Sequence, residues 1–388
     1  MAGENVVSLR FAQEWLEAER LAGETYGPEL LALPIREWRP GMKRNTNFRR
    51  YGTLKYALDQ IHNDILQAPA RARERAEVIV GFAEHVDAPL EQQRIGLAGL
   101  AWREYASALT WVGLFSEATD AAKRSLEFLT KHGSFACDAA KTRLVEALIH
   151  RELGNKSIAL EMTRACAAVF QLHADAEAYV KARMAESVVL NDSQRYRESM
   201  EILLETAEVA ERRGDRHTLA ICLHNTANCA RALGDHETAR NLDARSLKLF
   251  DQLGATAHRP FIRWTYAMSI ASEGHIDAAI SELYVAQADL LALGMNSKAA
   301  AFGLDILNLR HERGDDVQLT ASQLVEQFTR AGMLQSAIEA LAYLRGEAER
   351  GTISTTKIRY VREFILEVPK NPGQLFVLPP YDFEESGA

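Results

Sequence analysis

The sequence predicts an all-α fold, an α-solenoid in which helical hairpins are stacked along the chain. Three observations predict it: a turn residue recurs about every 40 residues, helical patterns flank each turn, and small residues occupy fixed positions. The 388 residues, 47% of them hydrophobic, would suffice for two or three globular domains or for one long array. The steady repeat favours the array.

The turn residue is usually glycine. A helix ends readily at glycine, because a left-handed backbone costs little without a Cβ atom. With Gln194 in the equivalent place of the third repeat, the spacings are 41, 40, 40, 40 and 40 residues. The marker residues, as we call them, are Gly113, Gly154, Gln194, Gly234, Gly274 and Gly314.

Each marker separates two helical patterns of opposite phase. Before Gly234, apolar or small residues recur at helical intervals from Leu219 to Leu233, and after it they do so from Ala239 to Leu249. Asp235 and Asn155 follow their markers, and these residue types are good N-caps for the second helix. Each period is therefore one hairpin of two helices, each of about 17 residues and roughly 25 Å long.

Small side chains occupy three positions in each of the first five repeats, namely seven residues before the marker and five and twelve residues after it. Such positions predict close crossings, since larger residues there would cost about 1 to 3 kcal/mol each by overpacking. The three series are Ala106, Ala147, Ser187, Ala227 and Ala267; Ala118, Ala159, Ser199, Ala239 and Ala279; and Ser125, Cys166, Thr206, Ser246 and Ala286.

This pattern resembles the tetratricopeptide repeat over about residues 95 to 315, and Trp102 matches the aromatic fourth position of that repeat. The unit is about six residues longer than the family's 34, and in this it is similar to the elongated repeats of bacterial regulators; the family's turn-forming proline is absent. The resemblance implies a right-handed superhelix in which the first helix of each hairpin lines a concave groove.

Four segments are expected. Residues 1–47 hold capping helices and a basic loop, residues 48–315 the repeat array, residues 316–368 three closing helices, and residues 369–388 an extended tail. The prolines of the tail disfavour a helix there. The tail either covers the last hairpin, which we favour, or offers a short motif to a partner.

The repeat register also predicts which side chains face the groove, at ten, six and three residues before each marker. The candidate binding residues in these slots are Arg103, Ser107, Arg151, Asn191, His224, Asn228, Arg231, Trp264, Met268, Asn308 and His311. The other slots hold Thr110, Leu144, Leu148, Met184, Val188, Ala271 and Leu304.

This mixture suits an extended peptide or a helix. Asparagine can bond to a peptide backbone, arginine can pair with a carboxylate, and Trp264 with Met268 can bury a side chain. His224 and Asn228, one turn apart beside Arg231, are the strongest local candidates. The alternative is that a slot residue faces the neighbouring hairpin or bonds locally.

Sequence motifs for catalysis and cofactors are missing: there is no GxSxG, HExxH, GxxxxGK[ST] or GxGxxG. His311, Glu312, Asp315 and Asp316 are metal-ligand types, but they surround Gly314, where helix-capping groups are expected. We therefore expect no enzyme activity, no cofactor and no metal.

The segment 36–50 is basic, with Arg36, Lys43 and Arg49 among its cations and Trp38 and Phe48 between them. It could contact nucleic acid through phosphates and stacking. The alternative, which we favour because the net charge is -8, is a loop pinned by its aromatic residues with its charges in water.

Taken together, these features predict a cytoplasmic, non-catalytic scaffold or regulatory adaptor of bacterial type that binds a protein or peptide in its groove. The N-terminus lacks a signal-peptide pattern, no apolar run is long enough to span a membrane, and the four cysteines are scattered. A homodimer is possible, and a nucleic-acid partner is not expected. Two alternatives remain: a peptide-responsive regulator resembling pheromone receptors, and a nucleic-acid-associated regulator using residues 36–50.

Overall fold

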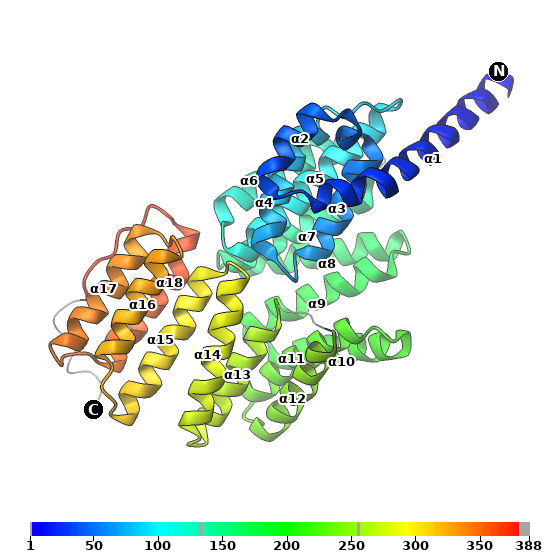
Figure 1. Ribbon diagram of the computed structural model, residues 1–388. Helices are drawn as coiled ribbons and strands as arrows, with labels where there is room; N and C mark the ends of the chain where they lie inside the picture. The colour runs from blue at the N-terminus through cyan, green and yellow to red at the C-terminus, as the bar shows by residue number, and fades with distance from the viewer. Residues whose placement is uncertain (1, 132–134, 254–256, 380–388) are drawn as a thin grey trace. The chain divides into compact units, whose positions relative to one another are not determined.

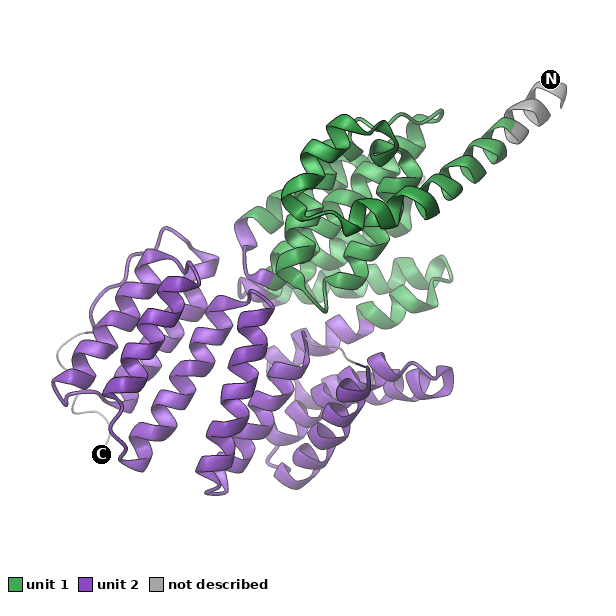
Figure 2. Ribbon diagram, in the orientation of Figure 1, with its two compact units in different colours: residues 1–111, 117–151, 157–182 green, residues 112–116, 152–156, 183–388 purple. Residues whose placement is uncertain are grey.

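The computed structural model describes residues 2–131, 135–253 and 257–379, and every regular element in these ranges is helical (Figure 1). The fold is an α-solenoid of helical hairpins, which confirms the predicted class. Clustering of contacts divides the chain into two compact units (Figure 2). Unit 1 holds residues 1–111, 117–151 and 157–182, and unit 2 holds residues 112–116, 152–156 and 183–388.

First and second helices of hairpins follow one another along the chain, as the repeat predicts. Those centred in unit 1 are α1 (Ala2–Ala32), α2 (Trp38–Arg44), α3 (Tyr51–Asp64), α4 (Pro69–Ala83), α5 (Glu91–Val112), α6 (Phe115–Thr130), α7 (Ala136–Glu152) and α8 (Lys156–Leu172). The helix α9 (Ala176–Asp192) begins in unit 1 and continues into unit 2.

The succession of first and second helices continues in unit 2. Its remaining helices are α10 (Tyr196–Arg213), α11 (Arg216–Ala232), α12 (His236–Leu253), α13 (Arg259–Ser272), α14 (Ile276–Ala292), α15 (Asn296–Arg313), α16 (Gln318–Arg330), α17 (Gln335–Glu349) and α18 (Thr355–Glu367). Several, including α11 and α14, are 17 residues long, the length that the repeat predicts.

Every marker residue has a left-handed backbone, as predicted. The φ angles of Gly113, Gly234 and Gly314 are 84°, 88° and 87°, and that of Gln194 is 61°. A second left-handed turn, which we did not predict, joins successive hairpins at Ala174, Gly214 and Gly294; the φ angle of Gly214 is 68°. Both ends of these hairpins are therefore set by one residue each.

Gln194 is exposed and adopts a conformation that costs an L-residue with a side chain roughly 1 kcal/mol. We expect Gln194→Gly to raise the free energy of unfolding by about 1 kcal/mol, measured by urea denaturation of the full chain. Gln194→Ala is the control, because it removes every side-chain atom beyond the Cβ but keeps the Cβ, which causes the backbone cost. An equal gain in both variants would contradict the backbone explanation.

The small positions are buried, which confirms the predicted close crossings. The first two series, from Ala106 to Ala267 and from Ala118 to Ala279, have no measurable exposure, and the third is at most 6% exposed. Close contact of the two helices thus recurs in each hairpin.

Three members of the third series also bond across the hairpin, whereas Thr206 bonds to the Ile202 carbonyl of its own helix. The hydroxyl of Ser125 donates to the carbonyl of Gly99 over 2.7 Å, and that of Ser246 donates to Ala220 over the same distance. Cys166 makes the equivalent contact with Ala140 over 3.3 Å. In each case the partner lies 26 residues earlier, on the first helix of the same hairpin.

The basic segment is not the loop that we expected. It forms α2 between two short 3-10 turns, and Trp38, Met42 and Phe48 are buried in the hydrophobic core of unit 1. The cations Arg36 and Lys43 are exposed, as the pinned-segment interpretation requires. Helix formation follows from burying one face of residues 38–44 and leaving the charged face in water.

The tail lies against the closing helices over the part that the structure describes. The ring of Phe376 is 5.7 Å from Tyr343 of α17 and 5.1 Å from Phe364 of α18. The Tyr360 hydroxyl donates to the Val377 carbonyl over 2.9 Å. Residues 380–388 lie outside the described residues, so the choice between cap and motif stays a prediction.

Candidate functional site

The predicted slot residues all lie at half-buried positions, neither in the core nor freely exposed. This holds in unit 1 for Arg103, Ser107 and Arg151 and in unit 2 for the other eight. Because the two units are separate bodies, each set of slots is considered on its own.

In unit 2 the first helices differ in exposure from the second helices. Residues 217–231 of α11, 259–271 of α13 and 296–311 of α15 include no exposed residue. The second helices α10 and α14, by contrast, carry exposed side chains such as Leu204 and Val285. We call the half-buried side of α11, α13 and α15 the slot face of unit 2.

Four side chains on α11 and α12 form a closed polar ring. His224 Nδ1 lies 2.9 Å from Asp243 Oδ1, and its Nε2 lies 3.2 Å from the Asn228 amide nitrogen. Arg231 donates to Asn228 Oδ1 over 2.9 Å and to Asp243 Oδ2. The structure thus brings together the three residues that the sequence singled out, and it adds the carboxylate that links them.

Asp243 is fully buried, and sequence reasoning missed it. It also accepts a bond of 3.3 Å from the hydroxyl of Thr265 on α13, so it joins two hairpins. A signal was present: nine residues after Gly113, Gly154, Gln194 and Gly274 stand the buried residues Ala122, Thr163, Leu203 and Leu283. An acid in such a buried column predicts a partnered charge.

The side chain of Trp264 makes its contacts with other residues of unit 2. Its indole Nε1 donates to Asp305 over 2.7 Å, and its ring stacks on Phe302 with 5.8 Å between centroids. Arg362 of α18 lies over the same ring and pairs with Asp305 at 2.7 Å. Burial raises the pKa of Asp305, although Arg362 opposes that shift. Met268 lies one turn further along α13, packed against an apolar cluster.

Two groove candidates on α11 and α15 have spare hydrogen-bonding capacity. Asn308 donates from its amide nitrogen to Glu312 over 2.8 Å, but its buried Oδ1 has no hydrogen-bond partner among the described residues. The same is true of the buried Nε of Arg231. Asn191 and His311 are half-buried on α9 and α15.

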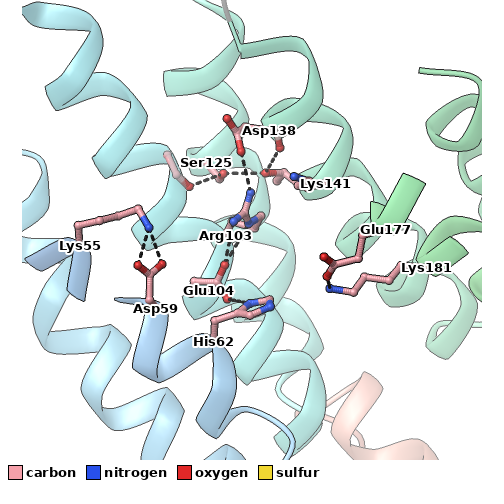
Figure 3. A network of polar contacts seen from close by, with 12 residues as sticks. Lys55, Asp59, His62, Arg103, Glu104, Ser125, Asp138, Lys141, Glu177 and Lys181 are labelled. Atoms are coloured by element: carbon pink, nitrogen blue, oxygen red, sulfur yellow. Dashed lines mark hydrogen bonds and ion pairs between the residues drawn. The ribbon is translucent and has the colours of Figure 1, made fainter. Parts of the chain in front are cut away.

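In unit 1 the slot residue Arg103 belongs to a chain of ion pairs that links successive first helices (Figure 3). Buried Glu104 of α5 lies 2.8 Å from His62 of α3 and 3.0 Å from Arg103, which reaches Asp138 of α7 at 3.2 Å. Burial alone would raise the pKa of Glu104, but Arg103 and His62 outweigh it and hold the pKa below its usual range. This network stabilises unit 1 and occupies the side chain of Arg103.

The remaining candidates for chemistry have structural roles. Asp316 accepts from the Gln318 backbone N–H over 3.0 Å just before α16, and Asp315 pairs with Arg313. Within the described ranges no group of three or more His, Cys, Asp or Glu side chains could hold a metal ion. Three of the cysteines are buried, and burial raises the pKa of Cys222 to about 12 and that of Cys166 to about 11.

The marker turns, the buried small positions and the half-buried first helices define the chain as a tetratricopeptide-type α-solenoid. Residues 183–252 match the family model of the tetratricopeptide repeat. No curated protein matches the chain. None of the helices in the described residues is both long enough and apolar enough to cross a membrane.

Solved structures of the same fold include regulators. A Rap protein complexed with competence and sporulation factor is 14% identical, with a TM-score of 0.60 and coverage of 92% of this chain and 96% of that one. The Rap conjugation regulator of plasmid pLS20, in complex with the Phr* peptide, is 11% identical with a TM-score of 0.56, covering 84% and 76%. The quorum sensor NprR from B. thuringiensis, in its apo form, is 12% identical with a TM-score of 0.52, covering 95% and 99%. At these identities the likeness shows the fold alone.

Proposed function

We propose that the chain is a non-catalytic regulator or adaptor that binds a peptide, or an extended segment of a protein, on the slot face of unit 2. One observation carries the proposal: α11, α13 and α15 expose no residue over 217–231, 259–271 and 296–311, yet present histidine, amide and aromatic side chains at half-buried positions. Solenoids use such recessed faces for binding.

The chemistry of this face supports a peptide. A peptide backbone supplies one donor and one acceptor per residue, and extended chains bind through such groups. Asn308 and Arg231 are half-buried, and a rotation of either side chain would bring its unbonded polar atom, Oδ1 or Nε, to a peptide backbone. Met268 adds apolar surface beside them on α13.

The structural neighbours favour regulation by a short peptide as the more specific form of this function. Two of them are described in complex with a factor or peptide, and another as a quorum sensor. For the adaptor and for the peptide-responsive regulator alike, we propose a cytoplasmic location and a monomer or a homodimer. Nucleic-acid binding by stacking on residues 36–50 has less support, because Trp38 and Phe48 are buried.

The test is to select peptides from a random library on the immobilised full chain and to measure their affinities. We expect Asn228→Ala combined with Asn308→Ala to weaken binding of the selected peptides at least tenfold, since Asn308 would lose a backbone bond and Arg231 would lose the Asn228 bond that positions it, each worth about 1 kcal/mol or more. Thermal unfolding of each variant verifies its fold. A rise in melting temperature with a short free peptide supports the peptide-responsive regulator.

Asn241→Ala is the matched control, because Asn241 is an exposed amide on the second helix α12. It should leave peptide affinity unchanged. If the double variant binds the selected peptides as well as the natural chain does, the slot face is not the binding site. If the library yields no binder, the proposed peptide function fails as a whole.

A further inference from the structure

The slots of unit 2 carry a single formal charge at neutral pH with histidine neutral. Arg231 is the only Arg, Lys, Asp or Glu among them. The other slots from α9 onward within unit 2 hold Met184, Val188, Asn191, His224, Asn228, Trp264, Met268, Ala271, Leu304, Asn308 and His311. The charge of Arg231 is balanced by Asp243, which its guanidinium contacts directly.

The burial of Asp243 keeps its carboxylate beside the guanidinium of Arg231. Its side chain has no exposed surface, and it accepts bonds from His224, Arg231 and Thr265. A carboxylate so enclosed keeps its place when a ligand binds, because moving it would remove the acceptor of His224 Nδ1 and the counter-charge of Arg231. The negative charge therefore lies directly beneath the slot face at α11.

The ring is satisfied only when His224 is neutral with its proton on Nδ1. Nδ1 then donates to Asp243, and Nε2 accepts from the Asn228 amide, whose oxygen accepts from Arg231. A proton on Nε2 would face the Asn228 NH₂ group. Flipping that amide would relieve the clash with His224 but would turn the same NH₂ group toward Arg231.

From this we infer that Asp243 is a specificity-determining residue: it restricts the ligand to an uncharged segment where it crosses α11. The inference rests on the proposed function and names the ligand chemistry of the same site. A ligand carboxylate would be attracted by Arg231, repelled by Asp243 and deprived of water, so it would gain little. A ligand cation would be repelled by Arg231, while Asp243 is already occupied.

An uncharged carbonyl avoids both penalties. It costs less to desolvate than an ion, and it is neither repelled by Asp243 as an anion is nor repelled by Arg231 as a cation is. A ligand with a peptide bond, an amide side chain or an apolar side chain at this point fits, whereas one with Asp or Glu does not.

The experiment compares matched peptides on the full chain. The tightest peptide selected on the natural chain is substituted at each position in turn with glutamine and with glutamate. At one position or more, we expect the glutamate peptide to bind at least tenfold more weakly than the glutamine peptide. Asp243→Asn should reduce that difference to less than threefold, because Arg231 then attracts the glutamate without opposition.

Asp289→Asn is the matched control: it removes one carboxylate from unit 2, the partner of Arg259, and leaves the ring intact. It should keep the tenfold difference. Equal affinity of the natural chain for both peptides at every position overturns the inference, and so does a difference that survives in Asp243→Asn. Failure to select any peptide overturns the proposed function instead.

A second measurement needs no ligand and covers the case in which Asp243→Asn does not fold. The ¹⁵N chemical shifts of His224 in the natural chain, assigned by comparison with His224→Gln, report which ring nitrogen carries the proton. We expect the Nδ1–H tautomer at neutral pH. The Nε2–H tautomer or a doubly protonated ring would show that the ring is not closed as described and would overturn the inference.

Discussion

Gly52→Ala should destabilise unit 1 by about 3 kcal/mol or more, the largest effect that we expect from a single methyl group in this chain. An added Cβ at Gly52 would lie 1.6 Å from the Glu19 carbonyl oxygen of α1, and Gly23 faces the same crossing. Backbone atoms cannot rotate away as a side chain can, so α1 and α3 would have to separate. Urea unfolding monitored by circular dichroism measures the loss.

Gly81→Ala is the control for Gly52→Ala. Gly81 lies inside α4 of the same unit, with nothing within 4 Å of an added Cβ. It should be neutral or gain about 0.5 to 1 kcal/mol, because glycine disfavours a helix interior. If both variants change stability alike, close approach of the backbones is not the cause.

Glu347→Ala should cost about 3 kcal/mol, because it removes the carboxylate of a largely buried ion pair. Lys357 of α18 is 2.7 Å from Glu347 of α17, and both side chains are largely buried. The Thr352 carbonyl also accepts from the ammonium group, at 2.8 Å, but it carries no charge. Glu349→Ala, which removes an exposed partner of Arg345 at 3.7 Å on the same helix, should cost less than about 1 kcal/mol.

The same pair gives a pH dependence with a defined sign. Burial alone would raise the pKa of Glu347, but hydrogen bonds from Lys357, Arg350 and Thr352 lower it to about 2. In the unfolded chain it is about 4.3, so the stabilisation is complete above that pH and is lost as the pH falls toward 2. Its size is about 3 kcal/mol, from 1.36 kcal/mol per pKa unit.

Glu347→Gln removes this titrating group and tests the assignment. The difference in unfolding free energy between the natural chain and Glu347→Gln should shrink as the pH falls from 5 toward 2. A difference that stays constant over this range would mean that Glu347 has the same pKa in the folded and unfolded chain.

The sequence predicted the repeat correctly because its signals are local and recur. One backbone angle at Gly113 or Gly234 and one small side chain at Ala147 or Ala227 are required in each period. Even Gln194, identified by position alone, has the left-handed φ angle. The repeat spacing therefore located the turn correctly, although glutamine stands there in place of glycine.

The polar connections could not be predicted in the same way, because they differ from repeat to repeat. Asp243 has no counterpart in the other hairpins, and the pairing of Glu104 with His62 joins residues 42 apart through no common rule. The short helix α2 was missed since its helical pattern is brief and interrupted by Pro40. Such contacts depend on three-dimensional proximity, which one sequence does not reveal.

The bonds from Ser125, Cys166 and Ser246 to the carbonyls 26 residues before them have a consequence for synthesis of the chain. Each closes within its own hairpin, so it can form once that hairpin has left the ribosome and before the next is made. Contacts of short sequence separation lower the entropy cost of closure and favour rapid folding. The array can therefore grow on the ribosome hairpin by hairpin, each completed pair offering a template for its successor.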